Sequence, residues 1–355
     1  EPVEPAVAGP QPRDSGAVSA ATLRRYSATA LFLECVRRVR PGFRPNAIEV
    51  HTIAHICRLL EGAPLAIELA AAWTRLLPLA EIARHLEQGL SLLTSSLRGV
   101  PPRQRSMMAA FDQSWRLLTP HERNFLRQLA VFRGGFTRAA AQAVAGADLT
   151  GLANLADASW LRMTAAGRCV LHELTRQYCA DKLEHEHLAE AGETADQVRH
   201  RHAAYYQSAL ASLWEEFFRR HGAIPEITPD LGNLLAAWDW SLMHDDLAMA
   251  WALSNGLGFL ADRQGKNQEM ARVFELGLVR LRADHVAQRG GPVQQRGRAA
   301  FLAALLANQC ERFSRIGQAD AAQACLQEAE TLLAHGETDD AQWAEARWFC
   351  GRMSA

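Results

Sequence analysis

The chain has 355 residues, 48% of them hydrophobic, which allows two to four compact domains and excludes wholesale disorder. Its 38 basic and 39 acidic residues nearly cancel, so no global field attracts nucleic acid or an anionic membrane surface. No apolar run reaches the roughly 18 residues of a spanning helix, and the seven cysteines are scattered singly, so we expect a cytoplasmic protein without a membrane partner.

Residues 1–21 are predicted to form a linker, because four prolines lie among the first twelve residues and no helical periodicity is present. The sequence begins at Glu1 rather than at methionine, and an unfinished helical pattern runs toward Ala355. We therefore expect this sequence to be a piece of a longer polypeptide.

Residues 22–98 are predicted to form a helical domain that contains one sharp corner. Between Ala47 and Leu60, apolar residues recur at i, i+3, i+4 and i+7, which marks one face of a helix. Gly62 then ends this helix, because glycine enters the left-handed cap conformation without steric cost. Pro64 begins the next helix, where its missing N–H would have no partner anyway.

Beyond the corner, the spacing of three apolar residues predicts the buried stripe of the second helix. These residues are Leu65, Leu69 and Trp73. A further helix is predicted over Ile82–Leu93.

Residues 99–184 are predicted to form a winged-helix domain, which begins at the boundary marked by Pro101-Pro102. A helix over Met107–Leu118 comes first. Thr119 and Glu122 then form a capping box with a proline at the first helical position, which is a strong signal for a helix start.

The rest of this domain is predicted as two short helices, a hairpin and a final helix. Thr137 caps a helix that runs through Val144, and residues 150–158 form the next one. Trp160–Met163 and Arg168–Leu171 flank Ala165-Ala166-Gly167, which predicts a small hairpin. The last helix begins near His172. Three helices followed by a hairpin give the outline of a winged helix.

Residues 185–246 are predicted to be a helical connector, and residues 247–355 a truncated α-solenoid of tetratricopeptide-like helix hairpins. The stretches 255–281 and 308–333 each contain a helix, a turn with glycine and a second helix with alanines at the crossing. The turn glycines lie 52 residues apart, which exceeds the roughly 34-residue tetratricopeptide period. A third hairpin is expected to open at 341–353. The expected fold is therefore mainly α.

Three segments carry a family resemblance: "GAPLAIELAAAWTRLLPLAEIARHL", "LTPHERNFLRQLAVFRGGFTRAAA" and "CVLHELTRQYCADKL". In this order they resemble successive parts of the signal-transduction ATPases with numerous domains. The most similar branch is the AP-ATPase or NB-ARC type of bacterial transcription regulators, in which tetratricopeptide repeats follow. The resemblance covers residues 22–183 and, more weakly, 229–335.

The resemblance implies three nucleotide-contact residues, which are Gly62 and Pro64 at the corner and His172 in the motif Leu-His-Glu. In that family the corner lies against adenine, and a Met-His-Asp-type histidine touches the phosphates of ADP and holds the off state. Leu171 and Glu173 replace the usual Met and Asp here and keep the apolar anchor and the charge. A helix start also favours phosphate by itself, through its unpaired N–H groups and dipole.

The residues alone also allow plainer interpretations, in which His172 packs at a domain seam and Pro64 is an ordinary first-turn proline. No Gly-x-x-x-x-Gly-Lys-[Ser/Thr] motif occurs, since Leu260 and Asn267 replace essential residues in "LADRQGKNQ". We therefore expect no ATP hydrolysis and no cofactor for this chain alone. ADP or ATP with Mg²⁺ would belong to the full-length parent, which the resemblance makes an NTPase.

No catalytic or metal site is predicted. Four histidines at positions 185, 187, 200 and 202 lie close in sequence, but no cysteine or aspartate arrangement completes a tetrahedral zinc site. His51 and His55 are one helical turn apart and lack an evident third ligand.

Two other functions are weighed against a signalling role. A DNA-binding winged-helix regulator is suggested by the net basic stretch 101–183, but the expected recognition segment Ala139–Leu161 contains no Lys or Arg and includes Asp148 and Asp157. Because duplex readout needs basic side chains there, this argues against DNA as a partner. A nucleotide-independent helical-repeat scaffold would leave the corner and the Leu-His-Glu motif as coincidences.

We therefore predict a regulatory and sensory fragment of an ATP/ADP-switched signalling ATPase. It would close over ADP held by an upstream nucleotide-binding domain and bind a protein or small-molecule inducer through the repeats. Whether the parent oligomerises on activation is left open, as is the core or surface position of four residues in the repeats: Trp251, Phe259, Arg263 and Phe274.

Overall fold

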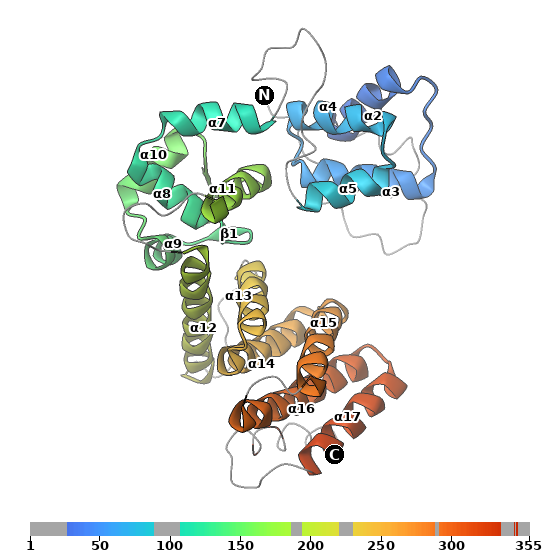
Figure 1. Ribbon diagram of the computed structural model, residues 1–355, viewed down its shortest axis with the longest axis vertical. Helices are drawn as coiled ribbons and strands as arrows, with labels where there is room; N and C mark the ends of the chain where they lie inside the picture. Colours follow the sequence, from blue (N-terminus) through green and yellow to red (C-terminus); the bar gives the residue numbers. More distant parts are fainter. Residues whose placement is uncertain are drawn as a thin grey trace. The chain divides into compact units, whose positions relative to one another are not determined.

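The computed structural model describes residues 27–88, 107–185, 194–219, 230–287 and 291–334, together with residues 344 and 346. The chain forms two compact units (Figure 1). The first contains Glu1–Val131 and Phe136–Ala195, and the second contains Phe132–Gly135 and Asp196–Ala355. The described residues are mainly α-helical and include one small sheet, which confirms the prediction of a mainly α fold.

The first half of the first unit is a helical bundle. Its elements are α2 (Ser27–Val39), α3 (Ala47–Leu59), α4 (Pro64–Ala72), the 3-10 turn η1 (Trp73–Arg75) and α5 (Leu79–Gln88). Helix α2 packs on α4, and α3 packs on α5. Phe32, Ile53 and Ile56 are fully buried among them and form the core.

The corner between α3 and α4 has the predicted backbone geometry. Gly62 adopts φ +74°, and Pro64 is the first residue of α4. The predicted stripe of α4 is wrong in part, because Leu69 is buried but Leu65 and Trp73 are only half-buried. Helix α4 instead turns its alanines and an isoleucine inward, and these small residues let α2 approach closely.

The second half of the first unit has the order predicted for a winged helix. Its helices are α7 (Met107–Leu117), α8 (Pro120–Leu129), α9 (Arg138–Ala145), α10 (Leu149–Asp157) and α11 (Glu173–His185). Its strands are β1 (Gly135–Phe136), β2 (Arg162–Met163) and β3 (Cys169–Val170). They form one sheet in the order β1-β3-β2, in which β2 and β3 are the predicted antiparallel hairpin.

The predicted helix caps of this region are present. The N–H of Glu122 donates to Thr119 Oγ1 (3.2 Å), and the N–H of Thr119 donates to the Glu122 carboxylate (2.8 Å). Thr137 Oγ1 accepts the N–H of Ala140 (3.1 Å) and begins α9. Caps could be predicted because their partners lie three residues apart in the chain.

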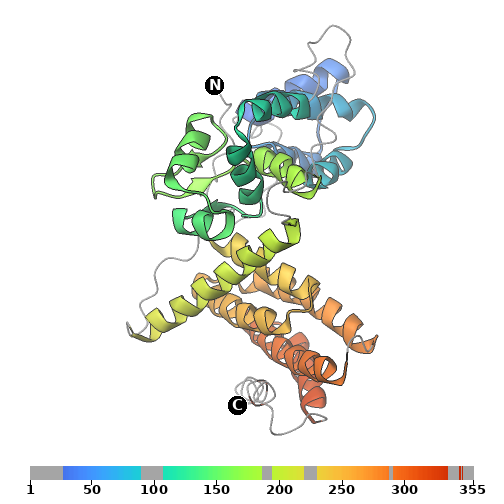
Figure 2. The same cartoon turned by 60° about the vertical axis from the view of Figure 1, so that its left-hand side comes forward.

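The second unit is a series of helices joined mostly by short turns (Figure 2). They are α12 (Ala195–Arg219), α13 (Leu231–Met243), α14 (Leu247–Gln264), α15 (Asn267–Val286), α16 (Pro292–Arg315) and α17 (Ala319–Ala334). The predicted turn glycines Gly265 and Gly317 both have positive φ, +66° and +77°. The two predicted tetratricopeptide-like hairpins are therefore α14–α15 and α16–α17.

Helix α16 is the centre of this unit. Residues 301–310 are buried at every position, and the helix packs against α14, α15 and α17. A helix that is buried on all sides has no solvent face to orient it. Its position must therefore be specified by particular polar contacts with the neighbouring helices.

Several sequence predictions lie outside the described residues. They are the linker 1–21, the boundary at Pro101-Pro102, the helix end at Leu93, His187 and the third hairpin at 341–353. The division into a linker, a helical domain, a winged helix, a connector and repeats stays a prediction.

Asn233 holds the segment Phe132–Gly135 inside the second unit. Its side chain is fully buried on α13. Its Oδ1 accepts the N–H of Arg133 (2.7 Å), and its Nδ2 donates to the carbonyl of Gly135 (3.1 Å). One buried amide therefore satisfies a backbone donor and a backbone acceptor of a segment 100 residues away.

His202 of α12 lies beneath the same segment. Its ring packs edge-on against Phe132, with the ring centroids 5.2 Å apart, and its Nε2 lies 3.4 Å from Asn233 Oδ1. Because the amide oxygen can only accept, the ring proton is on Nε2. Burial lowers the pKa of His202 to about 4, although the hydrogen bond to Asn233 opposes the shift. The imidazole is therefore neutral at pH 7.

Lowering the pH from 7 to 5 is expected to destabilise the fold through His202. Its pKa is about 4 when folded and 6.5 ordinarily, so the unfolded chain takes up the proton first and stability is lost between those two values. The loss at pH 5 should be about 2 kcal/mol in urea unfolding. His202→Gln should remove most of this pH dependence, whereas His200→Gln, at an exposed position on the same helix, should keep it. Equal pH dependence in the two variants would contradict this assignment.

Candidate functional site

The α3–α4 corner contains two consecutive residues in the left-handed region. Gly62 adopts this conformation without strain, but Glu61 (φ +46°) is not glycine, and such a residue costs about 1–2 kcal/mol. The N–H of Gly62 donates to the Cys57 carbonyl (3.3 Å), and that of Ala63 donates to the Leu60 carbonyl (2.9 Å). These bonds close the end of α3 and fix the direction in which Glu61 leaves the backbone.

The carboxylate of Glu61 lies at the N-terminus of α11. Its Oε1 accepts the backbone N–H of Glu173 (2.7 Å), and its Oε2 lies 3.3 Å from His172 Nε2. The start of a helix favours an anion, because its first N–H groups lack helical partners and its dipole is positive there. Glu61 therefore supplies a negative charge where the start of α11 favours an anion.

Hydrogen bonding fixes the tautomer of His172. Its Nδ1 accepts the backbone N–H of Leu174 (3.2 Å), so the neutral ring carries its proton on Nε2, which faces Glu61. Burial lowers the pKa of His172, while the carboxylates of Glu61 and Glu173 oppose the shift. At neutral pH the ring is therefore an uncharged hydrogen-bond donor.

Glu173 is held in place by Arg176. The guanidinium donates from Nε and Nη2 to both carboxylate oxygens of Glu173 (2.8 and 2.6 Å). Its Nη1 also donates to the carbonyl of Ala130, just beyond α8 (3.4 Å). Because Arg176 is buried, this bidentate pair fixes the first turn of α11 against the end of α8.

The structure brings the predicted corner and the predicted histidine together through Glu61. Gly62 is buried and Pro64 is half-buried at the start of α4, and His172 is half-buried at the start of α11. The nucleotide role of these three residues stays a prediction. Sequence reasoning missed Glu61, because an acidic residue at a helix end ordinarily belongs to a solvated face. The available signal was its position directly before the Gly-x-Pro corner.

Helix α10 directly precedes the β2–β3 hairpin, the place of the recognition helix in a winged helix. The exposed residues of this helix are Leu149, Thr150, Ala153, Asn154 and Asp157. None of them is basic, and one is acidic. Because contacts to DNA phosphates need Lys or Arg, this face is poorly suited to duplex DNA.

In the repeats, the structure assigns the four residues whose position the sequence left open. Trp251 and Phe274 are buried. Phe259 is half-buried, and the guanidinium of exposed Arg263 lies 5.6 Å from the centre of its ring. Of these four residues, Phe259 and Arg263 are the ones that reach the surface, as a cation–π pair.

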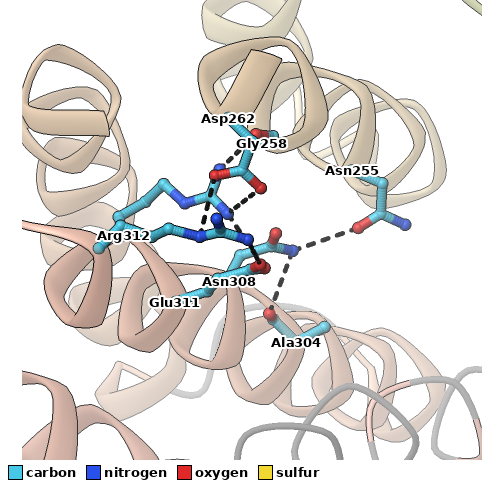
Figure 3. Close-up of polar contacts among 8 residues, drawn as sticks. Asn255, Gly258, Asp262, Ala304, Asn308, Glu311 and Arg312 are labelled. Atoms are coloured by element: carbon cyan, nitrogen blue, oxygen red, sulfur yellow. Dashed lines mark hydrogen bonds and ion pairs between the residues drawn. The ribbon is translucent and has the colours of Figure 1, made fainter. Parts of the chain in front are cut away.

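A buried polar seam joins α14 to α16 (Figure 3). Arg312, with 1% of its side chain exposed, donates to the carbonyl of Gly258 and to the carboxylate of Asp262 (2.9 Å to the latter). Asn308 Nδ2 donates to Asn255 Oδ1 (3.2 Å). Breaking a buried ion pair on one side leaves an uncompensated charge. These side chains therefore hold successive hairpins together.

Within the described ranges, no group of three or more His, Cys, Asp or Glu side chains is arranged to hold a metal ion. His55, one of the histidines noted in the sequence, lies 2.7 Å from the Glu87 carboxylate. No helix in the described part of the chain combines the length and the hydrophobicity needed to cross a bilayer.

No protein-family model matches the chain. A Mycobacterium tuberculosis protein named "Putative HTH-type transcriptional regulator" is 35% identical over 241 residues, which cover 65% of this chain and 26% of that protein. A second protein of that organism, named "Uncharacterized protein", is 37% identical over 176 residues, which cover 46% of this chain and 44% of that protein. The chain thus spans about a quarter of the length of the first relative.

Among solved structures, one match is the crystal structure of the "Signal Transduction ATPase with Numerous Domains (STAND) protein with a tetratricopeptide repeat sensor" from Pyrococcus horikoshii. It covers 92% of this chain and 43% of that chain, with a TM-score of 0.39 and 12% sequence identity. A TM-score at this level does not establish a shared fold.

Glu61→Gln is expected to lower the free energy of unfolding by about 1–2 kcal/mol, because a neutral amide is a weaker acceptor than a carboxylate at a helix N-terminus. Urea unfolding at pH 7 measures the change. Glu68→Gln, on the exposed face of α4, is the matched control and should lie within about 0.5 kcal/mol of the parent chain. Equal destabilisation by the two substitutions would show that the contact with α11 adds nothing.

Proposed function

We propose that this chain is the regulatory and sensory part of a signalling ATPase that switches between ATP and ADP. Its first unit would form part of a lid over ADP held by an upstream nucleotide-binding domain. The observation that carries the proposal is the contact of Glu61 with His172 and Glu173. This contact places the Gly-x-Pro corner and the Leu-His-Glu motif at one helix N-terminus.

The groups at this N-terminus suit an anionic oxygen. The backbone N–H of Glu173 donates to a carboxylate, and the Nε2–H of His172 faces the same carboxylate. A phosphate oxygen is an acceptor of the same charge type, and bound ADP would supply such oxygens. Glu61 is therefore an internal stand-in for an anion, and this supports the assignment of His172 to phosphate contact.

The proposal includes an exchange of anions at the start of α11. Two negative groups at one pair of donors repel each other strongly in a partly buried site. Glu61 must therefore leave these donors before a phosphate can approach them.

The other parts of the proposal follow from the sequence. ATP hydrolysis and Mg²⁺ binding are assigned to the upstream domain of the parent, because this chain has no phosphate-loop motif. The repeats are assigned to a protein or small-molecule inducer, and Phe259 and Arg263 are the first residues to test for contact with it. The proposed setting is cytoplasmic.

A transcriptional regulator is the second candidate, and the name of the mycobacterial relative favours it. The two proposals are compatible at the level of the full-length parent, since the matched segment is 26% of that relative. DNA binding through this chain is not proposed, because the exposed face of α10 has no basic residue. A simple scaffold would give the Glu61–His172 contact no function.

In the full-length parent, His172→Ala is expected to lower the affinity for ADP by about tenfold to about a hundredfold, the effect of losing one hydrogen bond to a charged group. Basal signalling should rise, because ADP holds the off state in this proposal. Titration with fluorescent ADP measures the first effect. His51→Ala, at an exposed position on α3, is the control. Unchanged ADP affinity in His172→Ala would rule the assignment out.

Glu61→Gln should have the opposite effect on the same titration. Removing the competing charge is expected to raise the affinity for ADP by about threefold or more, although the substitution destabilises the free protein. Weaker ADP binding by both Glu61→Gln and His172→Ala would mean that the two residues only shape the site, and the anion exchange would be wrong.

A further inference from the structure

The segment Phe132–Gly135, which we name the inserted turn, has an unusual place in the fold. In sequence it directly follows α8 and the residues Ala130 and Val131, and it precedes Phe136, all of which belong to the first unit. The inserted turn itself belongs to the second unit. The chain therefore leaves the first unit for four residues and then returns to it.

Side chains of α12 and α13 hold the inserted turn from several directions. Asn233 bonds its backbone at Arg133 and Gly135, and the ring of Phe132 packs against His202 and Tyr206. Helix α13 also approaches the backbone of the turn closely. A Cβ atom on Gly232 would lie 2.9 Å from the carbonyl oxygen of Arg133. Any displacement of α13 must therefore move or release the turn.

On its N-terminal side, the inserted turn leads to the start of α11. The carbonyl of Ala130, two residues before the turn, accepts a hydrogen bond from Arg176 (3.4 Å). Arg176 in turn makes the bidentate pair with Glu173, whose N–H is bonded to Glu61. Two covalent steps and three polar contacts thus connect the turn to the anion-binding position.

On its C-terminal side, the turn leads to the same place by a second route. Strand β1 begins at the last residue of the turn and is hydrogen-bonded to β3. Strand β3 ends at Val170, two residues before His172. The two flanks of the inserted turn therefore lead to Glu173 and His172, the two residues that face the Glu61 carboxylate.

We propose that the inserted turn is the joint through which the state of the repeat unit reaches the Glu61–His172 site. Movement of α12 or α13 releases or displaces the turn, and its flanks carry that displacement to Glu173 through Arg176 and to His172 through β3. The coupling itself needs no nucleotide. The idea that this displacement frees or blocks the anion-binding position for a phosphate rests on the proposed function.

The test is amide hydrogen exchange of the whole chain without nucleotide. Asn233→Ala should raise the exchange rate of the Glu173 and Leu174 amides by about twofold to about thirtyfold, the range that coupled networks carry. Gly232→Ala, which presses on the Arg133 carbonyl instead of removing a bond, should change the same amides in the same direction. The buried amides of residues 303–306 in α16 are the internal reference for global unfolding.

Asn308→Ala is the matched control, because it removes another buried amide of the second unit that bonds Asn255 and lies on α16. It should leave exchange at Glu173 and Leu174 unchanged. The joint is wrong if Asn233→Ala and Gly232→Ala both leave those amides unchanged, or if Asn308→Ala raises their exchange equally. ADP affinity in His172→Ala tests the proposed function separately, so either idea can fail without the other.

Discussion

The carboxylate of Glu61 at the first turn of α11 is the interaction on which the first unit depends. It joins the α3–α4 corner to the start of α11 across 112 residues of sequence. The contact requires a non-glycine residue in the left-handed region, so part of the stabilisation that the helix N-terminus provides is offset by backbone strain. The net stabilisation from this contact is therefore small, and a modest competing interaction can break it. A small free-energy difference between two arrangements is what a two-state element needs.

In the second unit, the main physical constraint is the position of the central helix α16. Residues 301–310 of this helix are buried at every position, and apolar packing alone leaves the rotation and the register of such a helix weakly specified. Buried amides and guanidinium groups supply the missing specificity, because each is costly to bury without its partner. Asn233 has the same role for the segment Phe132–Gly135, because its side chain provides hydrogen bonds to the backbone of Arg133 and Gly135.

Local physics made much of the fold predictable. The Thr119–Glu122 capping box, the helix start at Pro64 and the turn glycines depend on residues within four positions of one another, and the structure confirms them. The prediction for the buried face of α4 was wrong in part. Which of its residues face inward depends on how closely α2 packs, and no local sequence pattern encodes that distance. Glu61 and Asn233 could not be found in this way. Their partners lie 112 and 100 residues away, and each residue type is ordinary at its position.

The spacing of the contacts between α14 and α16 has a consequence for how this chain can vary. Asn255 of α14 contacts Asn308 of α16, and Asp245, in the turn before α14, contacts Arg298 of α16; both pairs are 53 residues apart, close to the 52 residues between the turn glycines. Matching positions of successive hairpins therefore contact one another at regular intervals. Deletion of one residue within either helix would rotate the rest of that helix by about 100° and misalign several of these contacts together. Length changes in descendants of this chain should accordingly collect in the connections and spare the helices, and partners such as Asp262 and Arg312 should be exchanged as pairs.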